Sequence, residues 1–387
     1  MKLIEFSTRP NMKYLVHLII WSFLHDISQD CIALFLDFHL ELTFLLLSFL
    51  GQFIVGGIGY LYHLKTKSKR LITDDSIFGI KLITNNKIKK YDSKCKIYSL
   101  IILAAFFDFV EFLIYILLAP YLQHCSYSLE KRLMALLIIF DVLFFRYVLK
   151  LPIFKHQMFS LVVIIICLVI TIATEFIFQD VDIFLRYGDF VAVLLVFILE
   201  GFFFSIVDVI EKYLFEYDYL NPFKLLMLEG IFSFGLGICY SLFISFFTSV
   251  QDYINSSKRA NLALIILSLL LFMILSALQS VFRAFTIKIY SPMASALSEF
   301  ILNPVYIILT FVLAEDFKSK KNKNLYFSIN LILTIIISLC GCIYNEFLIL
   351  FFWGLQYETH REIVFRAALS NCELELNDIN SCEDDDD

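Results

Sequence analysis

Acidic and polar residues recur at helical spacing inside three long apolar segments of this 387-residue sequence. Residues three, four or seven positions apart lie on one face of a helix. A carboxyl group at the centre of a bilayer is costly unless it faces protein or water, so such stripes mark candidate binding or proton-transfer sites. The three stripes are Ser22, Asp26, Gln29 and Asp30; Asp108, Glu111 and Tyr115; and Ser295, Glu299, Asn303 and Tyr306.

The stripes predict a polar cavity that is shared by their three segments and binds a solute or a proton. The alternative is that the polar groups satisfy one another or lie at helix interfaces. Glu229, beside Gly230, is a further acid within an apolar segment. It could cap a neighbouring helix or bind the solute.

Arg146 is interpreted as the one base that lies well inside an apolar segment. Asp141 falls on a different face of the same helix, so the two side chains do not meet. A partner on another helix, such as Glu111 or Asp108, is therefore expected. A structural ion pair and a substrate anchor are both open interpretations of Arg146.

The dipeptide Asn303-Pro304 lies in the middle of an apolar segment. Proline has no amide donor, so the carbonyl of Phe300 loses its helical partner. We therefore expect a helix break beside Glu299, with an unpaired carbonyl near a carboxylate. This arrangement suits a cation site or a hinge; an ordinary packed kink is the alternative.

These residues need long apolar helices to position them, and the composition supplies such helices. Hydrophobic residues make up 60% of the chain and charged residues 18%, against about half and a quarter in soluble domains. This excludes a disordered chain, a collagen, a disulfide scaffold and a soluble enzyme. Lipid demands internal backbone hydrogen bonds, and one helical span needs roughly 20 apolar residues. The predicted fold class is all-α, a polytopic membrane protein with about ten transmembrane helices, at 14–36, 43–62, 97–119, 133–149, 159–178, 189–211, 223–247, 261–283, 291–314 and 325–347.

Lys and Arg are more frequent in the loops on the side of the N-terminus, above all in the basic loop 63–96. Lys212 and Arg283 are also counted among these loop bases. By the positive-inside rule we expect both ends in the cytosol, with the lysines of 318–323 as an exception. The first segment, 14–36, is the weakest span: it either lies on the surface or spans with a polar face. The protein is expected to be multi-pass, in an endomembrane or the plasma membrane.

A glycine pattern indicates duplication, because Gly51 and Gly56 recur with the same spacing as Gly230 and Gly235. The equivalent segments are an odd number of spans apart, which inverts the second copy, as in many secondary transporters. Chance is the alternative, since glycine is common in membrane helices. We predict a first five-helix repeat at 1–180, a second at 181–350, and a cytosolic segment at 351–387 with an amphipathic part (354–370) and an acidic disordered tail.

Several short motifs resemble a known family. They are Asp208-Val-Ile-Glu-Lys-Tyr, Asn221-Pro222, Leu228-Glu229-Gly230-Ile231-Phe232, and Tyr290-Ser291-Pro292 at the start of a small-residue helix. Together they are similar to the second half of eukaryotic drug/metabolite transporters of the nucleotide-sugar-transporter-like (solute carrier 35-like, EamA-like) group. The resemblance covers roughly residues 200–350, and the first half agrees in span count. It implies ten helices in two inverted five-helix repeats, cytosolic ends and transport by alternating access.

The charges inside the predicted spans bear on the cargo. Bases neutralise phosphate best, and here only Arg146 and the edge residue Lys224 stand against many acids. We therefore expect a secondary transporter for a small cationic or neutral metabolite, with proton coupling through a buried carboxyl group. The acids are Asp26, Asp30, Asp108, Glu111, Asp141, Glu175, Glu200, Asp208, Glu229, Glu299 and Glu346.

Other functions remain as alternatives. They are a nucleotide-sugar-type carrier, a channel, and a membrane scaffold or receptor that has the same fold but does not transport. An intramembrane enzyme is not expected, because the sequence has no His-Glu-x-x-His or Gly-x-Gly-Asp element. The nine cysteines have no metal-binding spacing, and neither a cofactor nor a nucleic-acid partner is expected. The expected partners are the solute and the lipid bilayer, and a homodimer is left open.

Overall fold

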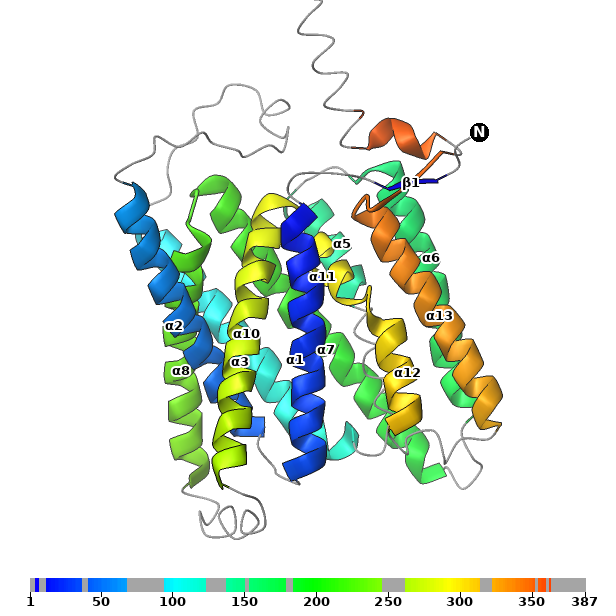
Figure 1. Ribbon diagram of the computed structural model, residues 1–387, viewed down its shortest axis with the longest axis horizontal. Helices are drawn as coiled ribbons and strands as arrows, with labels where there is room; N and C mark the ends of the chain where they lie inside the picture. The colour runs from blue at the N-terminus through cyan, green and yellow to red at the C-terminus, as the bar shows by residue number, and fades with distance from the viewer. Residues whose placement is uncertain are drawn as a thin grey trace, which may run out of the picture.

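The structure is a computed structural model, and it describes residues 4–6, 12–36, 41–67, 94–122, 137–149, 153–178, 184–245, 262–313, 322–351, 354–359 and 362. Long helices run side by side in one bundle, as Figure 1 shows. Most of the basic loop, most of the amphipathic segment 354–370 and the acidic tail lie outside the described residues.

The first half of the chain forms helices in each of its predicted spans. The helix α5 is the shortest of them, and its described part covers only the later portion of the predicted span 133–149. The bounds are α1 (Met12–Leu36), α2 (Glu41–Lys67), α3 (Lys94–Leu122), α5 (Leu137–Tyr147) and α6 (Lys155–Phe178).

The second half likewise follows its predicted spans, but two helices are longer than expected. The helix α10 continues beyond the predicted end at residue 283, because apolar residues such as Ile287 remain buried along the same face. Arg283 is therefore a helix residue and not a loop base, which corrects the sequence-based assignment. The bounds are α7 (Phe184–Tyr217), α8 (Pro222–Ser245), α10 (Leu262–Ile289) and α13 (Lys323–Tyr344).

The ninth predicted span is divided into two short helices, α11 (Pro292–Glu299) and α12 (Asn303–Leu313). Ser291 caps α11, since its side-chain oxygen accepts a hydrogen bond from the backbone N–H of Ala294, and Pro292 suits the first helical turn. Pro304 has no amide hydrogen to donate, so one continuous helix cannot run from α11 into α12. The predicted break beside Glu299 is confirmed.

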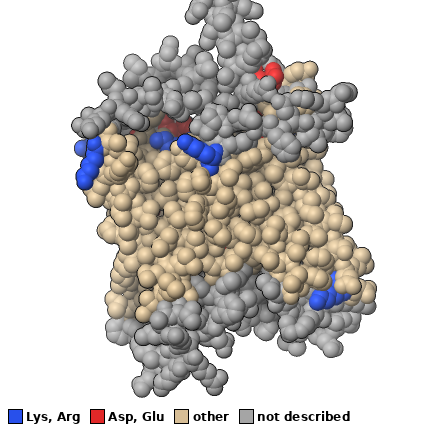
Figure 2. Space-filling view, viewed as in Figure 1, with Lys and Arg blue, Asp and Glu red and all other residues tan. Residues whose placement is uncertain are grey.

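Among the described residues, six helical ranges are long and apolar enough to cross a membrane, by length and composition alone, and one of them includes the break between α11 and α12. Their outward side chains are apolar, for example Val169, Leu267 and Phe243, each more than three-fifths exposed. Figure 2 shows the same property as a broad uncharged belt between charged groups near the two ends of the bundle. Since water would penalise such a surface, the chain is an integral membrane protein. The six ranges are 43–66, 155–174, 222–243, 266–289, 292–309 and 323–344.

The helices α2 and α8 pack closely against each other, because glycines at their contact let the two backbones approach. A Cβ on Gly56 would come within 2.6 Å of the backbone nitrogen of Met227 on α8. A Cβ on Gly230 would come within 2.6 Å of the backbone nitrogen of Phe53 on α2. The two backbones therefore touch at positions where only a hydrogen side chain fits, as is common in membrane helix pairs.

Two apolar cores lie on either side of this arrangement. One core joins α6, α11 and α13, around Leu168, Leu297 and Ile337. The other joins α3, α7, α8 and α10, around Ile101 and Leu214. The second core borders the charged groups that are described below.

A short pair of strands links the two ends of the described chain. The strand β1 (Ile4–Phe6) pairs antiparallel with β2 (Leu348–Leu350), with Glu5 opposite Ile349. Figure 1 places this pair at the end of the bundle where α1 begins and α13 ends. A 3-10 helix, Leu355–Glu358, follows the second strand.

Candidate functional site

One ion pair lies inside the helix bundle, between α7 and α10. The guanidinium of Arg283 on α10 donates to the carboxylate of Asp208 on α7, whose side chain is fully buried. The guanidinium carbon also lies 3.9 Å from the centre of the Phe204 ring, one turn before Asp208. A cation above an aromatic ring is attracted by the negative face of the ring. The bundle thus holds a desolvated cation between a carboxylate and an aromatic side chain.

Further carboxyl groups surround this pair. Asp108 and Glu111 on α3 interact electrostatically with both Arg283 and Asp208. Glu111 also interacts with Glu200, which lies two turns before Asp208 on α7. We define the carboxyl cluster as Asp108, Glu111, Glu200, Asp208, Glu211 and Glu229.

Two members of the carboxyl cluster lie close together. The side chains of Glu211 on α7 and Glu229 on α8 are within hydrogen-bonding reach of each other. Each residue is about 95% buried, with 5% of its surface exposed. Glu211 Oε2 and Glu229 Oε1 are buried, and no amide, hydroxyl or basic group of the described residues donates to either atom.

The carboxyl groups of the cluster outnumber the bases that interact with them. Arg283 is the cation that acts on Asp108, Glu111, Asp208 and Glu229 alike. Several ionised carboxylates around one guanidinium would leave uncompensated buried charge, which costs several kcal/mol per ion. Within the described part of the chain, no three or more His, Cys, Asp or Glu side chains are arranged to hold a metal ion. The excess carboxyl groups therefore need protonation or a further positive charge.

A buried lysine fixes α7 to the end of α10. The ammonium of Lys212 donates to the carbonyl oxygens of Ile287, Lys288 and Tyr290, at 3.0, 3.2 and 3.1 Å, and lies 2.9 Å from a carboxylate oxygen of Glu216. The last carbonyls of a helix have no partners within that helix. Lys212 provides hydrogen-bond donors for these carbonyl groups. It is therefore a buried helix residue and not one of the loop bases that were counted to predict the orientation of the chain.

Three of the predicted site residues meet in the carboxyl cluster: Asp108, Glu111 and Glu229. Their cationic neighbour is Arg283, whereas Arg146 was expected in that role. Arg146 is exposed in the last turn of α5, where a base interacts favourably with the helix C-terminus. The interpretation of Arg146 as the buried base is therefore corrected.

The described contacts divide the three predicted stripes. The helix α1 packs on α10 and α11, whereas α3 packs on α7 and α8. Asp26 on α1 is about a quarter exposed and lies 3.8 Å, from Oδ1 to Nδ1, from its neighbour His25. A single cavity lined by all three stripes remains a prediction.

The break between α11 and α12 differs from the expectation in one respect. The carbonyl oxygen of Phe300 is not unpaired, because it accepts a hydrogen bond from the hydroxyl of Ser338 on α13 at 2.9 Å and one from the backbone N–H of Asn303 at 3.1 Å. Asn303 itself is buried at the start of α12, and the side chain of Glu299 lies outside the described residues. The break is thus braced by α13, and a cation site at Phe300 is not supported.

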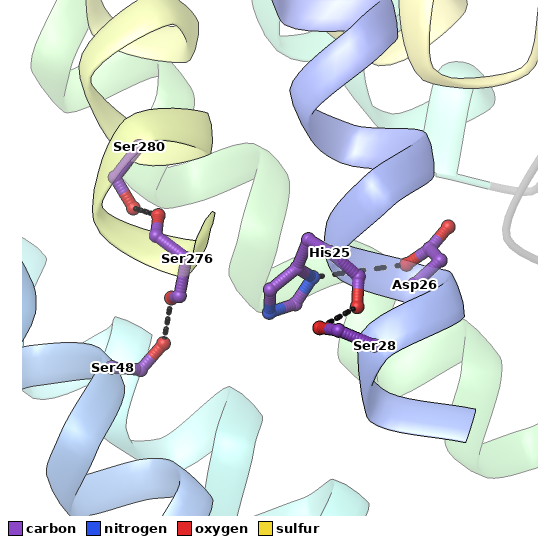
Figure 3. Close-up of polar contacts among 6 residues, drawn as sticks. All are labelled: His25, Asp26, Ser28, Ser48, Ser276 and Ser280. Carbon is purple, nitrogen blue, oxygen red and sulfur yellow. Dashed lines mark hydrogen bonds and ion pairs between the residues drawn. The ribbon is translucent and has the colours of Figure 1, made fainter. Parts of the chain in front are cut away.

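The contact between α2 and α10 is polar but uncharged. The hydroxyls of Ser48 on α2 and Ser276 on α10 hydrogen bond to each other, and the amide of Gln52 donates to Ser280 at 3.1 Å. Figure 3 shows the ring of His25 on the side of α1 that faces these serines. The same ring packs against Phe272 of α10. This region holds helices together without a buried ion pair among its described residues.

Two functional groups were missed or misplaced by sequence reasoning. Arg283 was assigned to a loop, although apolar residues follow it at helical spacing. Glu211 was noted only within the Glu-Lys motif of the family resemblance, and its position on the same face as Asp208, three residues earlier, was the available signal. The partner Glu229 was singled out, but nothing in the sequence shows which helix it faces.

No protein-family model matches the sequence, and no match was found among curated proteins. The resemblance to drug/metabolite transporters therefore carries no support beyond the motifs themselves.

Proposed function

We propose that this protein is a secondary transporter that moves a small cationic or neutral metabolite by alternating access, coupled to protons. The observation that carries the proposal is the carboxyl cluster. Its members come from α3 in the first half of the chain and from α7 and α8 in the second. Acids inside a membrane bundle are typical of ion pathways and proton relays.

Pairing of the helices supports the proposed inverted repeat. Exchange of the two halves would replace α1 by α7, α2 by α8, and α3 by α10. Under this exchange the contact of α3 with α7 becomes that of α10 with α1, and the contact of α3 with α8 becomes that of α10 with α2. All four of these helix contacts occur and are extensive.

Two further contacts agree with the exchange. The contact between α2 and α8 maps onto itself, although the glycines of the predicted pattern differ in their contacts: Gly56 meets the backbone of α8, whereas its equivalent Gly235 meets no atom within 4 Å. The contact of α5 with α7 becomes that of α11 with α1, and both occur. Such reciprocity is expected when two halves lie antiparallel about an axis in the membrane plane.

A discontinuous helix in the second half also favours a carrier. The interruption between α11 and α12 lies in a densely packed region, where Met293, Leu297 and Ser298 are fully buried. Broken helices line the substrate sites of many secondary transporters. Ser295 on α11 is 1% exposed, and its hydroxyl has no hydrogen-bond partner among the described residues. It is available to a solute.

The chemistry of the cluster favours a cation over a phosphate ester as cargo. A nucleotide sugar would need bases for its phosphates, and Arg283 is already engaged by Asp208. We infer that an organic cation would replace part of the role of Arg283 toward the surrounding carboxyl groups. A nucleotide-sugar-type carrier and a non-transporting scaffold are the alternatives that the experiment must separate.

Uptake into proteoliposomes tests the function. The purified protein would be given a panel of radiolabelled organic cations, neutral metabolites and nucleotide sugars, with and without a pH gradient. We expect accumulation of at least one cation or neutral solute that collapses when the gradient is removed. Uptake of nucleotide sugars alone would favour the alternative carrier, and no uptake across the panel would favour the scaffold.

Charge-neutral substitutions test the site. Glu111→Gln and Glu299→Gln should abolish gradient-driven uptake while expression and folding stay intact. Glu216→Gln is the matched control, because Glu216 is one-third exposed and Lys212 keeps its three carbonyl partners. Normal uptake in both test variants would remove these residues from the site.

We also propose that both ends lie in the cytosol, as the distribution of bases indicates. An epitope tag at each end, probed before and after selective permeabilisation of the plasma membrane, measures this. Detection of either tag on the luminal or extracellular side would reject the orientation.

A further inference from the structure

The pair Glu211 and Glu229 differs from the rest of the carboxyl cluster in how its charge is balanced. Asp208 is neutralised by the guanidinium of Arg283. Glu211 and Glu229 instead face each other within hydrogen-bonding reach, and both are buried. An ionised carboxylate can only accept hydrogen bonds, so one partner in a bond between two carboxyl groups must carry a proton.

At two of the four oxygens of the pair, no other donor of the described residues takes the place of that proton. Glu211 Oε2 and Glu229 Oε1 are buried and receive no hydrogen bond from an amide, hydroxyl or basic group of the described residues. Lys212, the residue next to Glu211, directs its ammonium to the end of α10 and to Glu216. The pair is thus a built site whose smallest ligand is a single proton.

The surroundings make loss of that proton costly. The charged groups that act on both members of the pair are Asp108 from α3, Asp208 from α7 and Arg283 from α10. The face of α2 that meets α8 near Glu229 is lined by Phe49 and Phe53. Two of the three charged neighbours are acids, so a second negative charge on the pair would be opposed by repulsion as well as by burial.

We propose that Glu211 and Glu229 share one proton and form the proton-binding site of this protein. The assignment of this proton as the coupling ion rests on the proposed transport function; its presence on the pair does not.

The location gives the proton a mechanical effect. Glu229 precedes Gly230, whose backbone touches α2, so this part of α8 is fixed to α2. Glu211 precedes Lys212, which fixes this part of α7 to the end of α10. With the proton present the pair holds α7 to α8, and without it the two carboxylates repel. Protonation therefore controls the contact between a unit of α2 and α8 and a unit of α7 and α10.

Infrared spectroscopy of the purified protein in detergent, without any cargo, tests the proposal. A protonated carboxyl group has a C=O stretch that is separate from that of a carboxylate and that shifts in deuterated water. We expect this band at neutral pH in the unmodified protein. Glu211→Gln and Glu229→Gln should each remove the whole contribution of the pair, because the introduced amide donates to the remaining carboxylate. The double variant should remove no more.

The control and the contrary outcomes are defined by the same measurement. Glu216→Gln, on the same helix as Glu211, should leave the band unchanged, and size-exclusion profiles should show that all variants remain folded. If each single variant removed half of what the double variant removes, the two acids would be independently neutral and the shared proton would be refuted. An unchanged band in all variants would show that both acids are ionised and would also overturn the proposal. Because no cargo is used, the two proposals can fail separately. A protein that does not transport could still hold the shared proton, and a transporter could lack it.

Discussion

On one side of the bundle α3 packs against α7 and α8, and on the other side α10 packs against α1 and α2. The proposed repeat exchanges these two sides, yet their polar chemistry differs. The first side holds the carboxyl cluster, and Arg283 reaches Asp208 of that cluster from α10. The second side holds neutral contacts, such as Ser48 with Ser276 and Gln52 with Ser280.

This difference indicates that the architecture does not need buried charge. Hydroxyl and amide groups already join α2 to α10, and on the charged side Ser233 of α8 donates in the same manner to the carbonyl of Ala105 on α3 at 3.1 Å. Neutral hydrogen bonds thus join helices on both sides, whereas the buried acids gather on one. Buried charges that the fold does not require are best explained by a function.

Among the substitutions that test the difference between the two sides, removal of the Arg283 guanidinium should change the free energy of unfolding most. Arg283→Ala leaves Asp208 buried among other carboxyl groups without its counter-ion, and loss of one member of a buried pair costs about 3–5 kcal/mol. Chemical denaturation in detergent measures the change in free energy of unfolding. The control Arg146→Ala alters an exposed base and should stay within about 0.5 kcal/mol.

The second substitution in a double-mutant cycle sharpens this result. Asp208→Asn combined with Arg283→Ala removes both charges, so the double variant should be more stable than Arg283→Ala alone. If the two effects were simply additive, the ion pair would not be the reason for the loss.

Loss of the Lys212 ammonium should have the next largest effect. Lys212→Met leaves the carbonyl groups of Ile287 and Tyr290 without this donor, with an expected cost of about 2–3 kcal/mol for a charged hydrogen-bonding group. Lys224→Met is the control, because Lys224 lies only over the Tyr98 ring, at 5.9 Å from its centre. Equal denaturation midpoints for the two variants would contradict a role of Lys212 in joining α7 to α10.

A glycine pair on α8 tests the contact that the two sides have in common. Gly230→Ala would place a methyl group against the α2 backbone and should cost about 1–3 kcal/mol. Gly235→Ala meets no atom within 4 Å, and alanine favours the helix by about 0.5–1 kcal/mol over glycine. Thermal unfolding should therefore shift in opposite directions, and the same shift in both would argue against backbone contact at Gly230.

The neutral side should show the smallest effect. Ser48→Ala removes the hydrogen bond to Ser276, and such bonds between membrane helices contribute about 0.6 kcal/mol on average. Ser241→Ala removes only a bond to the carbonyl of Gly237 in its own helix and should change less. A loss for Ser48→Ala as large as that for Arg283→Ala would abolish the distinction between the two sides.

Sequence reasoning located the helices well, because hydrophobic run length is a local property. The interruption at Asn303-Pro304 was predicted for the same reason, since proline acts on its own helix. The ends of α7 and α10 were placed too early, because the charges of Lys212 and Arg283 resembled loop residues. Their buried partners, the end of α10 and Asp208, come from distant parts of the chain.

The candidate site was predicted only in part, because its assembly depends on which helices meet. Asp108 and Glu111 were recognised as one face of a helix, but the sequence does not show that this face meets α7 and not α1. The contact between Glu211 and Glu229 likewise joins two helices, α7 and α8. Sequence periodicity shows which residues share a face of each helix, but not how the two helices are rotated relative to each other. The unpaired carbonyl expected at Phe300 is absent because Ser338, on another helix, supplies a donor.

The small pairing of β1 with β2 has a consequence for how α1 is inserted. Strands that share backbone hydrogen bonds stand on the same side of a bilayer, and here one strand precedes α1 while the other follows α13. The chain between them must return to the side it left, which requires an even number of crossings. With the ten predicted segments as the crossings, a surface position for α1 alone would make that number odd, so the three residue pairs of the small sheet favour a membrane-spanning α1.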